Sequence, residues 1–237
     1  MSIIENLKLV QSQMMTACAS VNRDPASVTL VAVSKQHPVS DILTLYEAGH
    51  RHFGENRLEE MREKFPSVTD KPIHWHMIGH IQSRKARDIP TYFEMIHSVD
   101  SFHLAQKLAD SAQKLGKAPL EVLLQVNVSG EESKSGLSGV NWAQNSDIRK
   151  ILWDEIRQII ALPHLRVTGL MTMAFIADNP EDTRPVFISL RNLRDALMND
   201  MGIDLPHLSM GMTDDFMVGI QEGATIVRVG RAIFGER

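Results

Sequence analysis

Apolar positions along the chain follow two spacings, one typical of helices and one typical of buried strands. Hydrophobic residues recur at steps of three or four from Ile3 to Val21, which predicts an amphipathic helix with one buried stripe. Val28–Val33 is an unbroken run of apolar or β-branched residues, which predicts a strand buried on both faces. Pro38 and Gly49 then flank a helical pattern, at the positions where helices commonly begin and end.

The same alternation continues along the chain and predicts eight strands in all. The seven further strands are expected at 50–56, 73–79, 93–100, 121–129, 165–174, 207–212 and 225–234. Helical segments are expected between them at 57–65, 83–89, 101–116, 148–162, 180–202 and 213–223, with a polar loop at 130–147. Short apolar strands that alternate with helices are typical of a parallel sheet covered on both faces.

Eight such units close into a (β/α)₈ TIM-type barrel, so we predict an α/β fold with a single barrel domain over residues 1–237. The alternative is an open doubly wound sheet, which is less favoured because no glycine-rich dinucleotide turn follows the first strand. The chain ends at Arg237, soon after the last predicted strand, so we expect no eighth helix. The extra helix at the N-terminus is expected to cover that gap.

Composition narrows the classes of function. The 237 residues carry a net charge of −4 with both signs mixed and no basic stripe, so we expect no nucleic-acid partner. No run is long and apolar enough to predict a membrane span. The single cysteine, Cys18, cannot form an internal disulfide, and no cysteine and histidine cluster has zinc spacing. We therefore expect a cytoplasmic protein without a metal, and a monomer because no long exposed apolar element stands out.

Lys35 is the first candidate for chemistry. It follows the strand at Val28–Val33, and active sites of barrels lie at the C-terminal ends of the strands. A partly desolvated lysine holds more free amine, which can attack an aldehyde and form a Schiff base. A solvated lysine at a strand end is the alternative, and its position alone does not decide between them.

Two later segments predict a phosphate site on the same rim. Met212 and Thr213 end the seventh predicted strand after a glycine, and Gly230 and the Arg231 amide follow the core of the eighth. Loops after strands seven and eight often bind phosphate in barrels through main-chain amides. Thr213 as a simple helix cap is the alternative. A lysine and a phosphate site together suggest a phosphorylated aldehyde, either a phosphosugar or pyridoxal 5′-phosphate (PLP).

Arg228 and a histidine pair complete the candidates. Arg228 shares a strand face with Gly230, either in the barrel interior or toward the helices, and a buried arginine needs a partner. It is either half of a structural ion pair or a donor to a ligand such as a pyridine nitrogen. His74 and His76 alternate onto one face, but no third metal ligand has a useful spacing.

Several segments, taken together, resemble the YggS/PROSC family of pyridoxal phosphate homeostasis proteins. They are "LVAVSK" (30–35), "FGEN" (53–56), "WHMIGHIQSRKARDI" (75–89), "KSG" (134–136), "LSMGMTDD" (208–215) and "VRVGRAIFG" (227–235). Their order and spacing match the family over nearly the whole chain. The resemblance implies a barrel like the N-terminal domain of alanine racemase, which is the barrel of PLP fold type III.

The resemblance also implies residue roles. Lys35 would hold PLP as an internal aldimine, and Arg228 would face the pyridine nitrogen. The phosphate would be held by Thr213, Gly230 and Arg231, while Asn56 and Met212 would line the cofactor site. Position 231 is usually a small hydroxylated residue in this family, so the Arg231 side chain would either add a charged phosphate contact or point into solvent.

Three functions remain open at this point. The resemblance favours a PLP-binding protein of vitamin B6 homeostasis with little or no turnover, whose partners would be PLP and the apo-forms of PLP-dependent enzymes. A PLP-dependent amino-acid racemase is the first alternative. It needs acid/base groups on both faces of the substrate, whereas Tyr46 and Tyr92 are predicted away from the rim and the chain ends with the barrel. A Schiff-base aldolase is the second alternative, which fits the lysine but not the family segments.

Overall fold

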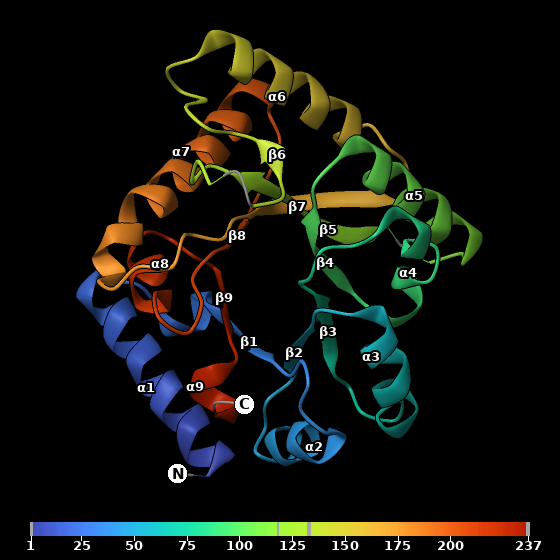
Figure 1. The fold of residues 1–237 in the computed structure, drawn as a ribbon, viewed down its shortest axis with the longest axis vertical. Helices are drawn as coiled ribbons and strands as arrows, with labels where there is room; N and C mark the ends of the chain where they lie inside the picture. The colour runs from blue at the N-terminus through green and yellow to red at the C-terminus, as the bar shows by residue number, and fades with distance from the viewer. Residues whose placement is uncertain (1, 118, 132–133, 236–237) are drawn as a thin grey trace.

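Eight parallel strands close into a barrel in the computed structural model, which describes residues 2–117, 119–131 and 134–235. The barrel strands are β1 (Thr29–Val33), β2 (His52–Glu55), β3 (His74–Met77), β4 (Met95–Val99), β5 (Leu120–Asn127), β7 (Leu165–Met171), β8 (His207–Ser209) and β9 (Ile226–Val229). Each pairs with the next in this order, and β9 pairs in parallel with β1, for example Leu30 with Val227. Figure 1 looks down the closed ring. The predicted barrel is confirmed.

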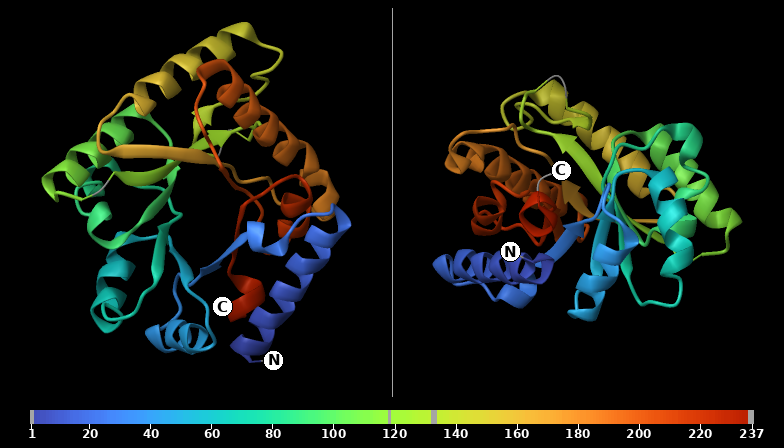
Figure 2. Two further views of the ribbon diagram at one scale, coloured as in Figure 1. Left: turned by 180° about the vertical axis from the view of Figure 1, so that it is seen from behind. Right: turned by 60° about the horizontal axis from the view of Figure 1, so that its bottom comes forward.

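Helices surround the ring on its outer side (Figures 1 and 2). They are α1 (Ile3–Ser20), α2 (Val39–Glu47), α3 (Leu58–Lys64), α4 (Ile89–Tyr92), α5 (Phe102–Lys114), α6 (Ser146–Ile160), α7 (Arg184–Met201), α8 (Phe216–Gln221) and α9 (Arg231–Phe234). Most of the apolar core lies between these helices and the sheet. A smaller cluster fills the barrel interior and includes Val31, Leu123, Met171 and Ile226.

The N-terminal helix covers the side of the barrel next to the last strand. A capping box fixes the start of α1, because Ser2 and Glu5 each accept a hydrogen bond from the other's amide. The helix packs against α8 and α9 (Figure 1), and Asn6 donates a hydrogen bond of 2.9 Å to the carbonyl of Ile233. The prediction that this helix covers the gap is confirmed.

Two predictions about the connections were wrong. The eighth strand was expected to reach Phe234 with no eighth helix after it, but the strand ends at Val229, and residues 231–234 form the short helix α9. Gly230 starts this turn, because its carbonyl accepts from the amides of Ile233 and Phe234. The expected polar loop contains the two-residue strand β6 (Leu137–Ser138), which pairs with the end of β5. Residues 132 and 133 of that loop lie outside the described residues.

The segment at 83–89, expected as a short helical connection, is a 3₁₀ turn at Ser83–Lys85 followed by α4 from Ile89. Pro90, which cannot donate a main-chain hydrogen bond, falls in the first turn of α4, where no such bond is needed. Within the described ranges, no helix has both the length and the apolar composition that a bilayer crossing requires.

Candidate functional site

Lys35 lies at the C-terminal rim of the barrel and is half-buried. Val31 belongs to the barrel interior, and alternate residues of a strand share a face, so Val33 continues the interior row and Lys35 begins the turn just beyond it. Lys35 lines a pocket of about 190 Å³ together with Asn56 and Glu60. Lys35 therefore lies on the rim, as predicted, and its reaction with an aldehyde stays a prediction.

Asn56 follows β2 and borders the same pocket as Lys35. It also borders a second pocket of about 250 Å³, which extends past Gly79 and His80. Gly79 allows the two loops to approach closely, because a Cβ at this position would lie 2.3 Å from the Asn56 carbonyl oxygen. Asn56 and Lys35 therefore share a pocket, and the role of Asn56 in lining the cofactor site stays a prediction.

The loop after β8 leaves two amides unpaired. Gly211 adopts a φ of +96°, a left-handed conformation that favours glycine, and turns the chain at the rim. Within the described residues, the amides of Thr213 and Asp214 donate to no protein acceptor. The Met212 amide is already engaged, since it donates to Asp215 Oδ1 over 2.6 Å. Met212 can therefore offer a ligand its side chain but not its amide.

The loop after β9 lies beside the strand that carries Lys35. A Cβ at Gly230 would lie 3.3 Å from Val33 Cβ, which shows how tightly this loop packs on β1. The Arg231 side chain is exposed and donates to both carboxylate oxygens of Asp214, over 2.6 and 2.5 Å. Arg231 thus joins the two candidate phosphate loops and points along the surface.

Arg228 faces the barrel interior, which decides between the two faces left open by the sequence. Its side chain is buried, with one guanidinium nitrogen donating to Ser209 Oγ and the other to the Thr172 carbonyl over 3.0 Å. Burial lowers the pKa of Arg228 to about 10, and the charge of Asp215 opposes that shift. Arg228 therefore remains a cation at neutral pH.

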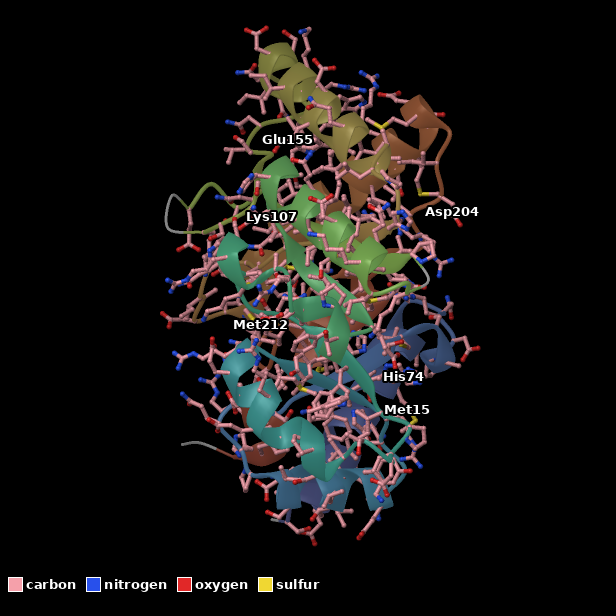
Figure 3. The ribbon with its side chains drawn as sticks, turned by 90° about the vertical axis from the view of Figure 1, so that its right-hand side faces the viewer. Met15, His74, Lys107, Glu155, Asp204 and Met212 are labelled. Carbon is pink, nitrogen blue, oxygen red and sulfur yellow. The ribbon has the colours of Figure 1, made fainter. Side chains whose placement is uncertain are left out.

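These candidates share one end of the barrel but do not all line one pocket. Thr213 borders a pocket of about 410 Å³ with Gln13 of α1 and Gln221 of α8, on the outer side of its loop. In Figure 3, Met212 and His74 are labelled toward opposite ends of the barrel axis. This agrees with their places after β8 and at the start of β3.

His74 and His76 do not form a metal pair. His74 is exposed and its Nδ1 lies 2.7 Å from Glu94 Oε2, whereas His76 is buried in the barrel interior, where Nδ1 lies 2.9 Å from His97 Nε2. Among the described residues, no group of three or more histidine, cysteine or acidic side chains is arranged to hold a metal ion.

Comparison with known proteins identifies the family. The family model described as "Alanine racemase, N-terminal domain" matches residues 8–237. A pyridoxal phosphate homeostasis protein of Pseudomonas aeruginosa is 41% identical over 236 residues, covering 100% of this chain and 96% of that protein. The protein of the same name from Aquifex aeolicus is 38% identical over 237 residues, covering 100% and 99%. This chain belongs to the family of pyridoxal phosphate homeostasis proteins.

Solved structures agree with this membership. PipY of Synechococcus elongatus without PLP is 36% identical and matches with a TM-score of 0.85, covering 99% of this chain and 100% of that one. The structure of PipY with PLP bound matches with a TM-score of 0.82 over the same shares. The whole described fold is therefore shared with this relative.

Sequence reasoning missed the partners of the candidate residues. Ser209 and Thr172 surround Arg228, and Lys64 and Glu55 contact the turn that carries Lys35. The only one of these contacts that the sequence could have predicted is the ion pair of Glu60 and Lys64, because residues four apart lie on one face of a helix. Nothing in the sequence pointed from that pair to Ser34, 30 residues earlier.

Proposed function

We propose that this protein binds PLP, holds it covalently through Lys35 and serves PLP homeostasis with little or no turnover of its own. The observation that carries the proposal is the position of Lys35, on the barrel rim next to the loop that starts at Gly230. Support comes from relatives named for PLP homeostasis and from PipY, which is 36% identical and has a structure with PLP bound.

The donors at the rim fit PLP by their chemistry. Lys35 offers an amine, and the unpaired amides of Thr213 and Asp214 offer hydrogen bonds to an anion. The Thr213 hydroxyl adds another donor, and Arg228 offers a buried cation for a ring nitrogen or another acceptor. Such a set suits a small molecule that carries an aldehyde at one position and a phosphate at another.

We assign each residue one task in the bound state. Lys35 would hold PLP through its Nζ, because PLP would supply an aldehyde carbon with which an amine forms a carbon–nitrogen double bond by loss of one water. Thr213 and the main chain at Gly230 and Arg231 donate to the phosphate. Arg228 donates toward the ring nitrogen. Apart from these donors, Asn56 and the Met212 side chain border the ring.

The assignment to a carrier rests on Arg228 and on the two tyrosines. A permanently charged donor at the ring nitrogen leaves that nitrogen unprotonated, which weakens its ability to stabilise a carbanion. Racemisation also needs an acid/base group on each face of the substrate. Tyr46 lies under the guanidinium of Arg51, and Tyr92 packs edge-on against Phe65, so both belong to the outer helical layer.

The proposal also covers the partners, the oligomeric state and the cellular location of the protein. We infer that apo-forms of PLP-dependent enzymes receive the cofactor, and that the chain acts as a monomeric single-domain protein. The buried free thiol of Cys18 suits a reducing compartment, which supports a cytoplasmic location.

A binding titration tests the function. Addition of PLP to the purified protein should give a near-visible absorption band that saturates at one equivalent, and Lys35→Ala should not give it. An unchanged band in Lys35→Ala would refute the covalent claim. A racemase assay across amino acids tests the carrier claim, which turnover in the ordinary enzyme range, on the order of 1–10³ s⁻¹, would overturn.

A further inference from the structure

Three charged side chains are gathered beneath the turn that carries Lys35. Lys64 Nζ lies 2.8 Å from Glu55 Oε1 and 2.6 Å from Glu60 Oε1. The Glu55 side chain is fully buried, and the side chains of Lys64 and Glu60 are 8% and 17% exposed. Buried charges are costly unless they are paired and hydrogen-bonded, so this fold maintains the cluster against a desolvation penalty.

The cluster contacts the main chain on both sides of Lys35. Before it, the Ser34 carbonyl accepts a hydrogen bond of 2.8 Å from Lys64 Nζ, and Ser34 Oγ donates over 2.6 Å to Glu55 Oε1. After it, the Gln36 amide donates to Glu60 Oε1. The three protein acceptors around Lys64 match the three donors of an ammonium group. Ser34 and Gln36, the residues on either side of Lys35, are therefore both hydrogen-bonded to one buried cluster.

Gln36 needs such a tie because of its backbone conformation. Its φ is +63°, in the left-handed region that is unfavourable for a residue with a side chain. Residues held in this region persist where their surroundings determine them, and they gather at functional sites. Glu60 accepts from the amide of this residue and so favours the turn over a relaxed extended chain.

The ties also set the direction of the Lys35 side chain. Ser34 follows the interior-facing Val33 and points the other way, toward Glu55 and Lys64. Lys35 is the first residue of the turn that follows, so the hydrogen bonds of Ser34 and Gln36 fix the main chain from which its side chain leaves. Lys35 and Glu60 accordingly line the same pocket of about 190 Å³.

We propose that Glu55, Glu60 and Lys64 are positioning residues that hold the Lys35 turn in the orientation needed for attachment of the cofactor. This inference rests on the proposed function, since it assigns a second layer of residues to the same lysine. In this scheme all three act through the main chain at Ser34 and Gln36.

The test separates attachment from binding by using two ligands. PLP has the aldehyde that Lys35 attacks, whereas pyridoxamine 5′-phosphate has the same ring and phosphate but cannot form the bond. Glu60→Ala is the main variant, because Glu60 is the most exposed member and its loss leaves the Lys64–Glu55 pair intact. Stopped-flow absorption gives the attachment rate for PLP, and calorimetry gives the affinity for pyridoxamine 5′-phosphate.

Glu60→Ala should slow attachment on the order of tenfold to a hundredfold, the usual effect of a misplaced reacting group, while affinity for pyridoxamine 5′-phosphate changes less than about threefold. Hydrogen exchange of the Gln36 amide, measured without any ligand, should speed up in the same variant. Glu60→Gln keeps an acceptor for that amide and should recover most of the attachment rate. Glu63→Ala, an exposed site on the same helix, should behave as the unaltered protein.

Two results would overturn the inference. One is attachment by Glu60→Ala at the unaltered rate with an unchanged Gln36 amide. The other is a parallel loss of stability, attachment and affinity for pyridoxamine 5′-phosphate, which would make the cluster merely structural. Lys64→Met removes the cation that pairs with the buried Glu55, and this variant can fail to fold for that reason. It is therefore tested together with Glu55→Gln, which removes the buried negative charge. If the unaltered protein attached no PLP but bound pyridoxamine 5′-phosphate, the proposed function would fail instead.

Discussion

His97 Nδ1 lies 2.9 Å from the hydroxyl oxygen of Ser209, and this contact links Arg228 to a row of histidines inside the barrel. Arg228 donates to the same hydroxyl oxygen. On the other side, His97 Nε2 lies 2.9 Å from His76 Nδ1, and His76 Nε2 lies 3.1 Å from His52 Nδ1. Strands β2, β3, β4, β8 and β9 thus contribute to one continuous chain of hydrogen bonds.

The end of this chain at Arg228 suggests the order of its donors. A guanidinium only donates, so Ser209 Oγ accepts from Arg228. We predict that the Ser209 hydroxyl uses its one proton to donate to His97 Nδ1. His97 then carries its proton on Nε2 and donates to His76, which donates in the same way to His52. We predict that nitrogen-15 NMR at neutral pH will show all three rings as neutral Nε2–H tautomers. An Nδ1–H tautomer at His97 would contradict this order.

The same row predicts a loss of stability in acid. Burial, reinforced by neighbouring histidines, lowers the pKa of His52 to about 4 and of His76 to about 3, and lowers that of His97 well below 6.5. The unfolded chain binds protons below about pH 6.5 while the folded chain does not. The contribution of these neutral rings to the free energy of unfolding is therefore fully present above about pH 6.5. It decreases as the pH falls toward the pKa values of the rings in the folded chain.

Urea unfolding at pH 7, 6 and 5 measures this effect. Each of these histidines can lower the free energy of unfolding by up to about 1.4 kcal/mol per pH unit below 6.5. His52→Gln should reduce the slope, whereas His103→Gln, at an exposed site, should leave it unchanged. The comparison is made between variants because burial raises the pKa of Glu55 and Asp215, which acts in the opposite direction. Equal slopes in all three proteins would contradict the account.

Arg228→Lys should destabilise the protein although the charge is kept. The guanidinium reaches Ser209 and the Thr172 carbonyl at once, which a single ammonium cannot reproduce with the same geometry. An unsatisfied buried acceptor costs about 1–3 kcal/mol, so we expect a drop of that size in the free energy of unfolding. Arg166→Lys, at an exposed arginine paired with the partly buried Glu121, should change it by less than about 1 kcal/mol. A smaller loss at Arg228 than at Arg166 would show that its buried contacts contribute little.

The Arg231 side chain is expected to contribute little to the free energy of unfolding and modestly to the affinity for PLP. Both members of its pair with Asp214 are more than half exposed, so the pair contributes about 0–1 kcal/mol. Because its guanidinium is engaged by Asp214, we expect Arg231→Ser to weaken PLP binding by less than about tenfold, equivalent to 1.4 kcal/mol. Asp214→Asn should strengthen binding by releasing the cation. Isothermal titration of both variants decides this, and a loss well beyond tenfold in Arg231→Ser would mean that its side chain holds the phosphate.

The sequence predicted those features that depend on local pattern. The alternation of strand-like and helix-like apolar spacing located the strands of the barrel. The apolar stripe on residues 3–21 predicted the helix that covers the barrel next to its last strand. It failed at Gly230, where four residues that read as a continued strand form α9. It also could not foresee that His97 and Ser209 meet, since 112 residues separate them and only closure of the barrel brings them together.

In the candidate site, too, local sequence predicted some features, whereas others depend on the tertiary structure. Lys35 and Gly230 could be assigned to the rim because each lies just past the apolar centre of a strong strand pattern. The interior face of Arg228 required the actual register of β9 with β1, in which Arg228 pairs with Val31. The engagement of the Met212 amide by Asp215 depends on the shape of one turn, which residue types alone do not fix.

The central claim is that Lys35 is the residue to which PLP becomes attached. The most direct measurement is reduction of the PLP-loaded protein with borohydride, followed by digestion and mass spectrometry of the peptides. We predict one phosphopyridoxyl group per chain, located on Lys35, and no modification at that level on Lys64 or Lys134. A modification on another lysine, with Lys35 unmodified, would contradict the account.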